Sequence, residues 1–285
     1  MPAQLLKGGP IAAAIKEQLG PQVQELRSQG VALALAAVQV GENPASAVYV
    51  RQQQKGCEEV GIAYHLHQLP ADTDQPALAA CLQRLNADPA VTGVILQLPL
   101  PGGVNPRPLQ ALIAPAKDVE GVSPANLGWL TYGTPRLAPC TALGVMELIA
   151  STGVDLYGKS VTVVGHSEIV GKPVALLLLD KFATVSICHV GTAERGELAD
   201  YVRRGEILVV AVGKPAVVRG DWVRPGAIVV DVGINRVGEK IVGDVEFEPA
   251  AERAAFITPV PGGVGPLTVA MLLRNTVAAA RLQQA

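Results

Sequence analysis

One stretch decides the fold: Ser160-Val-Thr-Val-Val-Gly-His-Ser-Glu-Ile-Val-Gly171, followed at once by Lys172-Pro-Val-Ala-Leu-Leu-Leu-Leu179. The apolar run at its start is typical of a buried parallel strand, and the apolar run after Gly171 has the composition of a helix. Glycine at both ends of the intervening loop lets the backbone approach an anion closely. The free N–H groups at the N-terminus of the following helix attract that anion. The stretch predicts a phosphate-binding unit; the alternative is an ordinary strand-to-helix turn.

The spacing departs from the G-x-G-x-x-G dinucleotide fingerprint, because Ser167 replaces the second glycine and Gly171 comes one position late. A NAD site usually places Asp or Glu about 20 residues on, to hold the ribose 2′-OH. The segment Cys188-His-Val-Gly-Thr192 carries no carboxylate, which favours NADP over NAD. The nearby groups that could meet a 2′-phosphate are His166, Lys172 and His189, although a solvated lysine without a role fits equally well.

Strand and helix patterns alternate on both sides of this unit. Further strands are expected at residues 31–40, 62–69, 91–98, 183–188, 207–212 and 227–232, and helices at residues 46–61 with Ser46 as cap, 75–86, 141–151 and 268–282. Such alternation indicates parallel sheets with right-handed crossovers. We therefore expect two parallel-sheet α/β domains, the second Rossmann-like. Residues 1–138 with 264–285 would form one domain and residues 139–263 the other, the last helix packing on the first domain.

The composition narrows the class of protein. The chain has 285 residues, 49% hydrophobic and 17% charged, which excludes a disordered chain. A formal charge of −2 and 4% aromatic residues disfavour nucleic acid as a partner. The apolar run at residues 31–40 is too short for a membrane helix. Four separated cysteines, no metal motif and no leader segment favour free thiols in the cytoplasm.

Three polar residues of the first domain follow or lie near the carboxyl ends of strands: Tyr49, Gln97 and Asp118. Open α/β sheets bind ligands at these ends. Each also has a plainer interpretation: Tyr49 as a packed aromatic, Gln97 as a buried amide satisfied by backbone, and Asp118 as the partner of Lys117 in a surface ion pair. Taken singly, these residues are weak evidence for a site.

Two glycine- and proline-rich segments are consistent with simple turns, and the second of them favours function. Gly213-Lys-Pro215 follows a strand, and Pro259-Val-Pro-Gly-Gly-Val-Gly-Pro266 precedes the last helix. The second is a stiff loop suited to lying against a flat ligand, carried by rigid flanking elements.

Taken together, the motifs resemble one family, the bifunctional methylenetetrahydrofolate dehydrogenase/methenyltetrahydrofolate cyclohydrolases. The resemblance covers nearly the whole chain and rests on nine blocks in the family's order: Asn43-Pro-Ala-Ser46 with Tyr49-Val50, Gln97-Leu-Pro-Leu-Pro101, Lys117-Asp-Val-Glu-Gly121, Pro139-Cys-Thr141, Gly165-x-Ser-x-x-Val-Gly-x-Pro173, Val212-Gly-Lys-Pro215, Asp231-Val-Gly-Ile-Asn-Arg236, Gly243-Asp-Val245 and Pro259-Val-Pro-Gly-Gly-Val-Gly-Pro266.

The resemblance implies a function. Such an enzyme oxidises 5,10-methylenetetrahydrofolate to 5,10-methenyltetrahydrofolate with NADP+, then adds water to give 10-formyltetrahydrofolate for one-carbon metabolism and purine biosynthesis. It also implies a homodimer whose active-site cleft lies between the folate domain and the cofactor domain.

Site residues carried over by the resemblance fall into three groups. Tyr49 would stack on the pterin, Asp118 would hydrogen-bond it and Gln97 would assist at the reacting centre, with Gln53 as the fourth catalytic position. Pro261, Gly262 and Gly263 would face the folate. The cofactor-binding set would be Thr141, Gly165, His166, Ser167, Val170, Gly171, His189 and Ile234.

One departure from the family is chemically important. The family places an acid–base Lys four residues after the Tyr, and this chain has Gln53 there. Lys55 does not substitute for it, because residue 53 lies about 40° from Tyr49 around a helix whereas residue 55 lies about 240° away. Glutamine donates a hydrogen bond but does not carry or cycle a proton. We therefore expect hydride transfer to survive and cyclohydrolysis to be lost or much weakened.

A second departure concerns the cofactor. The family usually carries a basic residue after Cys-His and often another after the first loop glycine, where this chain has Val190-Gly191 and His166. NADP stays the expected cofactor because no ribose carboxylate appears. Two rival functions remain open: a nicotinamide-dependent dehydrogenase of another small metabolite, and a folate- or nucleotide-binding protein that has lost catalysis.

Overall fold

The computed structural model describes residues 3–42 and 44–284, so Asn43 of the first motif lies outside the described residues. The chain divides into two compact units. We name the two units after the ligands that the resemblance implies. The cofactor unit comprises the chain up to Ala12 and Thr141–Thr268, and the folate unit comprises Ala13–Cys140 and the chain from Val269 onward. No helix in the described part of the chain has the length and hydropathy needed to cross a bilayer.

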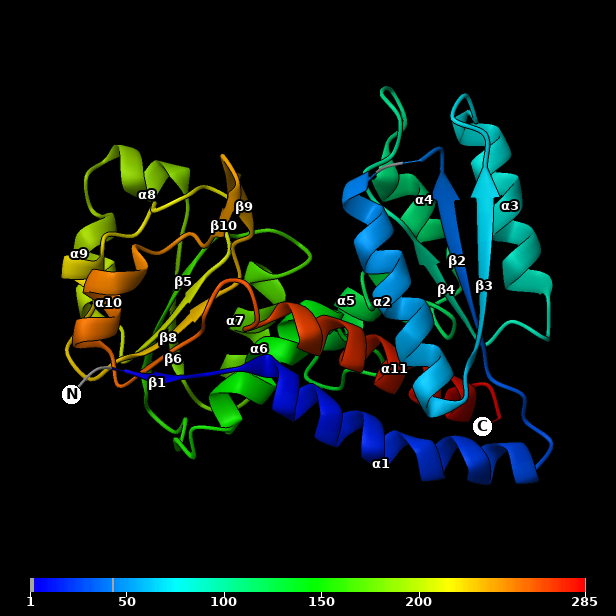
Figure 1. The fold of residues 1–285 in the computed structure, drawn as a ribbon, viewed down its shortest axis with the longest axis horizontal. Coiled ribbons are helices and arrows are strands. Elements are labelled where there is room, and N and C mark those ends of the chain that lie inside the picture. Colours follow the sequence, from blue (N-terminus) through cyan, green and yellow to red (C-terminus); the bar gives the residue numbers. More distant parts are fainter. Residues whose placement is uncertain (1–2, 43, 285) are drawn as a thin grey trace. The chain divides into compact units, whose positions relative to one another are not determined.

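The cofactor unit is built on a six-stranded parallel sheet (Figure 1). Its strand order is β1 (Gln4–Leu5), β11 (Phe256–Ile257), β8 (Ile228–Asp231), β7 (Ile207–Val210), β5 (Ser160–Val164) and β6 (Thr184–Cys188). Strand β6 pairs with one side of β5, and β7, the next strand in the sequence, pairs with the other side. The carboxyl ends of β5 and β7 thus form a topological switch point, where open α/β sheets bind ligands.

Helices and a small hairpin complete this unit. The helices are α6 (Cys140–Ala150), α7 (Gly171–Leu179), α8 (Val190–Glu194), α9 (Leu198–Arg204), η1 (Gly220–Trp222) and α10 (Phe247–Arg253), and the hairpin pairs β9 (Asn235–Val237) with β10 (Lys240–Val242). All four residues of both β7 and β8 are buried, as expected for central strands covered on both faces.

The folate unit has a three-stranded parallel sheet in the order β3 (Ala63–Leu69), β2 (Ala34–Val40) and β4 (Gly93–Leu96). Its helices are α2 (Pro44–Val60), α3 (Gln75–Ala87), α4 (Pro106–Leu112), α5 (Pro124–Thr131) and most of α1 (Gly8–Ser28) and α11 (Gly265–Leu282). Ala36, Val38 and Val40 pack against α3 and α4. Tyr64 is in register with Leu35, so it points to the opposite face, where α2 lies (Figure 1).

The fold class was predicted correctly, and several details were not. Ser46 does not cap α2, because the helix already begins at Pro44; its hydroxyl instead donates to the Leu98 carbonyl at 3.4 Å. The segment before Pro139 contains α5, and the N-terminal part contains α1, neither of which was expected. The domain assignment also differs at the N-terminus, because Gln4–Leu5 joins the sheet of the cofactor unit beside β11.

Candidate active site and cofactor-binding loops

Helix α2 presents two of the predicted residues on one face. Gln53, one turn after Tyr49, is fully buried, and it lies close enough to the Tyr49 hydroxyl to lower the pKa of that group slightly. Burial is the larger effect and raises the Tyr49 pKa strongly. Lys55 points away, as the helical geometry predicts: its side chain is 78% exposed and its Nζ lies 4.0 Å from Glu59.

Gln53 is held by its carbonyl oxygen. The amide Nε2 of Gln97 donates to Gln53 Oε1 at 2.7 Å, and the hydroxyl of Tyr64 donates to the same atom at 3.1 Å. The amide nitrogen of Gln53 is buried and makes no hydrogen bond of normal geometry. Such an orphaned donor costs free energy unless a ligand supplies the acceptor.

Gln97 follows β4 rather than lying inside the strand, because β4 ends at Leu96. Its backbone N–H still donates to the Val38 carbonyl at 2.8 Å, which fixes the residue against the sheet. Its side chain is therefore not satisfied by backbone, the plainer interpretation of the sequence, but by Gln53. Since Nε2 donates to Gln53, the carbonyl oxygen Oε1 is the end of the amide left for a ligand.

Asp118 is not a surface residue and does not pair with Lys117. It is completely buried, and its carboxylate accepts hydrogen bonds from the backbone N–H groups of residues 121, 122 and 123 at 2.7–3.3 Å and from Asn126 Nδ2 at 2.9 Å. Lys117 instead donates to the carbonyls of Leu85 and Asp88. The Asp118 carboxylate shapes the loop and has little capacity left for a ligand.

Glu120 is the carboxyl group of this loop that stays available. Burial, reinforced by the negative charge of Asp118, raises its pKa to about 8. Its side chain accepts no hydrogen bond within the described residues, and it interacts electrostatically with both Tyr49 and Cys140. The folate unit therefore brings Tyr49, Gln53, Gln97 and Glu120 together, and Asp118 holds the loop that carries Glu120.

The loop after β5 has the close backbone approaches that a phosphate site requires. Gly165 has φ +118°, and a Cβ there would lie 2.2 Å from the Ala211 carbonyl oxygen, at the end of β7. A Cβ on Gly171 would lie 2.1 Å from the carbonyl oxygen of Gly165. Neither position accepts a side chain without rearrangement. Ser167 closes the loop by accepting from the Val170 N–H at 3.1 Å.

Two buried aspartates hold the loops after β7 and β8. Asp244 accepts from the N–H groups of Val212, Gly213 and Lys214 at 2.6–2.9 Å and from Asn235 Nδ2 at 2.8 Å. Asp231 accepts from three more backbone N–H groups at 2.8–3.0 Å. Burial raises the Asp231 pKa to about 6, although those hydrogen bonds oppose the shift. These loops and the Gly165 loop all follow the carboxyl ends of parallel strands.

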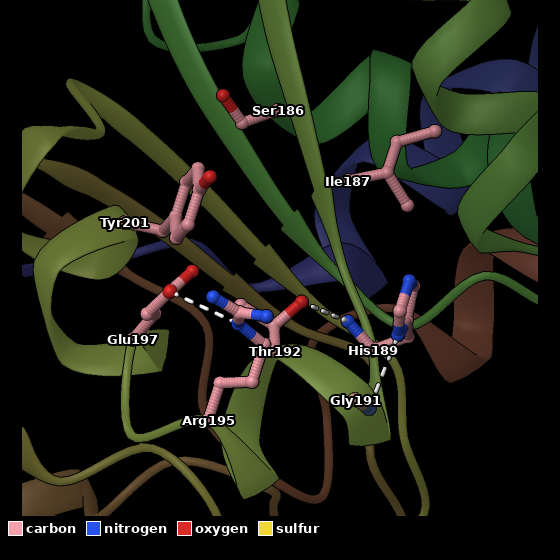
Figure 2. A pocket seen from close by; sticks show the side chains of 8 residues that line it. All are labelled: Ser186, Ile187, His189, Gly191, Thr192, Arg195, Glu197 and Tyr201. Atoms are coloured by element: carbon pink, nitrogen blue, oxygen red, sulfur yellow. Dashed lines mark hydrogen bonds and ion pairs between the residues drawn. The ribbon is translucent and has the colours of Figure 1, made fainter.

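A pocket of about 440 Å³ lies beside the end of β6 and is drawn in Figure 2. His189 Nδ1 accepts from the Gly191 N–H at 3.2 Å, which leaves Nε2 as its donor nitrogen. The His189 ring lies 5.2 Å from that of His166, so the ends of β5 and β6 bring two of the predicted cofactor residues together. Arg195 lines the pocket and pairs with Glu197 at 3.1 Å.

The remaining predicted residues also lie in the cofactor unit. Thr141 Oγ1 is 3.4 Å from Thr268 Oγ1, Ile234 is 67% exposed before β9, and Gly262 accepts from the Gly8 N–H through its carbonyl at 2.9 Å. Pro261 and Gly263 flank it in the same unit. No group of three or more His, Cys, Asp or Glu side chains arranged for a metal ion occurs within the described residues.

Two family models match the chain. The catalytic domain of tetrahydrofolate dehydrogenase/cyclohydrolase matches residues 6–120, and its NAD(P)-binding domain matches residues 139–284. The chain belongs to the tetrahydrofolate dehydrogenase/cyclohydrolase family. The matched ranges differ from the two units at residues 6–12 and 269–284, which the structure groups with the other unit in each case.

Individual relatives of this family match over their full length. The bifunctional protein FolD of Moorella thermoacetica is 52% identical over 99% of this chain and 100% of its own. A crystal structure of the bifunctional FolD enzyme from Campylobacter jejuni is 44% identical with a TM-score of 0.94, covering 99% of each chain. The Trypanosoma brucei enzyme, described in complex with NADP cofactor and an inhibitor, is 39% identical with a TM-score of 0.95 over 100% of this chain and 99% of its own.

Sequence reasoning missed several residues that the structure brings to the candidate site. Glu120 stands in the same motif as Asp118, and the two carboxyl groups differ in the hydrogen bonds that Asp118 alone accepts from its loop. Asp231 and Asp244 stood in quoted motifs without a role. Tyr64 carried no signal, because an aromatic residue in a strand pattern is usually a packing residue.

Proposed function

We infer that this chain is an NADP-dependent methylenetetrahydrofolate dehydrogenase whose cyclohydrolase step is lost or much weakened. The observation that carries the second half of this proposal is Gln53, a buried neutral amide one helical turn after Tyr49. Family membership supports the first half.

Hydride transfer needs positioning of two reactants more than proton transfer. NADP+, when bound, supplies the hydride acceptor. The fit for its pyrophosphate rests on Gly165 and Gly171, where a Cβ would collide with backbone. Asp231 and Asp244 order the neighbouring loops, because the backbone N–H groups that they accept from are already paired. We assign Thr141, His166, Val170, His189 and Ile234 to the same cofactor site.

Hydrolysis of the methenyl group is different, because water must lose a proton as it adds to carbon. An amide has no titratable proton near neutral pH, so Gln53 neither accepts nor returns one. The phenol of Tyr49 is a poor substitute, since burial raises its pKa far above neutrality. The absence of a proton carrier at residue 53 is the reason to expect weak cyclohydrolysis.

Within the folate unit we propose Tyr49 as the surface that stacks on the pterin, Gln97 as an acceptor at the reacting centre, and Glu120 as the carboxyl group that meets pterin N–H donors. Glu120 replaces Asp118 in this role, because the four hydrogen bonds of Asp118 are already made within the loop. Pro261, Gly262 and Gly263 stay assigned to the folate.

NADP is favoured over NAD because no carboxylate follows β6 directly, where a ribose 2′-OH would be held. His166 and His189 are the groups we assign to the 2′-phosphate. Comparing kcat/KM for the two cofactors tests the assignment; a strong preference for NAD would overturn it.

The proposal also covers the oligomeric state and the cellular location of the protein. The outer edge of β6 is unpaired within the described sheet, and Tyr157, Leu179, Phe182 and Ile187 are exposed around it, which favours a homodimer through this edge. Sedimentation should give a dimer for the natural chain and a monomer for Phe182→Asp.

All four cysteines are unpaired and buried, as expected of a protein that works in the cytoplasm.

The deciding experiment follows NADP+ reduction by the purified chain with 5,10-methylenetetrahydrofolate as the reductant. Folate-dependent reduction supports the dehydrogenase and excludes a dehydrogenase of another metabolite. Binding of both ligands in calorimetry without any reduction would instead identify a binding protein that has lost catalysis.

A further inference from the structure

The hydrogen bonds around Gln53 give the site a defined polarity. Gln53 Oε1 already accepts from Gln97 and from Tyr64, so the ends of the two amides left for a ligand are Gln53 Nε2, a donor, and Gln97 Oε1, an acceptor. Tyr64 reaches this network from β3, on the sheet face that α2 covers. Removing its hydroxyl would leave Gln97 as the one side chain of the described residues that donates to Gln53 Oε1.

The charge of the reacting folate changes during the oxidation. The C–H bond of the methylene group breaks, both electrons leave with the hydride to reduce NADP+ to NADPH, and the carbon left behind shares one positive charge with its two nitrogens. A site that stabilises this charge as it develops accelerates the step, and a fixed positive charge at the same place would oppose it.

We propose that the Tyr64–Gln53–Gln97 network adapts this site to bind the cationic methenyl product, with Gln97 Oε1 and the Glu120 carboxyl as its electronegative groups and Tyr64 as a positioning residue. The inference rests on the proposed function and goes beyond it. Gln53 is then more than a missing acid–base group, because its neutrality removes a charge that would repel the product, and its fixed orientation turns the Gln97 carbonyl toward the ligand.

The experiment measures dissociation constants of two probes at one pH: 5,10-methenyltetrahydrofolate, which is cationic at its C1 bridge, and tetrahydrofolate, which is not. We expect the natural chain to bind the cation about tenfold more tightly than tetrahydrofolate. In Gln53→Lys, the preference for the cation over tetrahydrofolate should fall about tenfold or more, because a buried ammonium group then lies close to the cation. Gln54→Lys is the matched control, since Gln54 is the next residue of α2, exposed and paired with Glu58.

Tyr64→Phe tests the positioning role. Loss of its hydroxyl should weaken binding of the cation about threefold more than binding of tetrahydrofolate, because the Gln53 amide that orients the Gln97 carbonyl loses one of its hydrogen bonds. Damage to the fold would instead weaken the binding of both probes by the same factor.

Each remaining outcome has one meaning. Failure of tetrahydrofolate itself to bind would contradict the proposed function. Equal affinity of the natural chain for both probes, or equal effects of Gln53→Lys and Gln54→Lys, would overturn this inference alone. If Tyr64→Phe keeps the full preference for the cation, Tyr64 is not a positioning residue of this network.

Discussion

Only Val119 separates Asp118 from Glu120, yet the two carboxyl groups have opposite surroundings. Asp118 accepts four hydrogen bonds from its own loop and from Asn126, whereas Glu120 accepts none within the described residues and has a pKa raised to about 8. One carboxylate builds the loop, and the other is left for a ligand.

Replacing Asp118 by Ala should destabilise the protein strongly. Three backbone N–H groups and the Asn126 amide would lose a buried acceptor, and each unsatisfied donor costs about 1–3 kcal/mol. We expect the free energy of unfolding to fall by about 3–5 kcal/mol in urea titrations. Asp72→Ala, at an exposed position, is the control and should change it by less than about 0.5 kcal/mol. A small effect at Asp118 would contradict the structural role given to it.

Glu120 should make the binding of the cationic product depend on pH. In the free protein its carboxyl group is protonated below about pH 8 and ionised above it. Because the ionised form attracts the cation, affinity for 5,10-methenyltetrahydrofolate should rise with pH through this range. The rise should be about tenfold for each unit by which the bound cation lowers the Glu120 pKa. The groups facing Glu120 are Asp118 on its own loop, Tyr49 on α2 and Cys140 on α6, with Arg274 acting on Cys140.

Glu120→Gln is the corresponding test variant. Affinity for the cation, measured in the first seconds after mixing, should become nearly independent of pH between 7 and 9, a window set about one unit on either side of the Glu120 pKa. A pH dependence that persists in this variant would assign it to another group.

Gln53→Lys should gain methenyl hydrolysis, because an amine at this buried position is able to accept and return a proton. We expect the rate of methenyl decay at saturating protein to rise at least about a hundredfold above that of the natural chain, the lower end of the range typical of a single acid–base group. The control Gln54→Lys adds the same charge on the exposed side of α2 and should leave decay unchanged. A gain in both variants, or in neither, would argue against residue 53 as the determinant.

Gly171→Ala should impair cofactor binding. The new Cβ would lie 2.1 Å from the Gly165 carbonyl oxygen, so the loop has to move away from the position in which its N–H groups meet a phosphate. We expect the dissociation constant for NADPH, from fluorescence titration, to rise about tenfold or more, equivalent to about 1.4 kcal/mol. Gly102→Ala, whose Cβ would meet nothing within 4 Å, should bind NADPH normally.

The sequence predicted the parallel α/β architecture because buried strands leave long apolar runs, and β5 was expected with its observed bounds. It failed where several patterns look alike. Helix α5 is short and lies in a loop-like stretch, and β1 has two residues that gain their role only by pairing with β11. Local sequence does not record such long-range pairing.

The candidate site was predicted in part for a related reason. The helical spacing of Tyr49, Gln53 and Lys55 fixed which side chains share a face, and the structure agrees. Nothing in the sequence separated Asp118 from Glu120, because the difference is which carboxyl group finds backbone donors after folding. Tyr64 joins Gln53 from a neighbouring strand, a contact that only the sheet register creates.

The most direct test follows the methenyl product itself after the natural chain oxidises 5,10-methylenetetrahydrofolate with NADP+. With neutral Gln53 in the site, methenyltetrahydrofolate should accumulate in step with NADPH and then decay at the rate seen in buffer without protein. Decay that accelerates in proportion to the concentration of the chain would show an efficient cyclohydrolase and contradict the account.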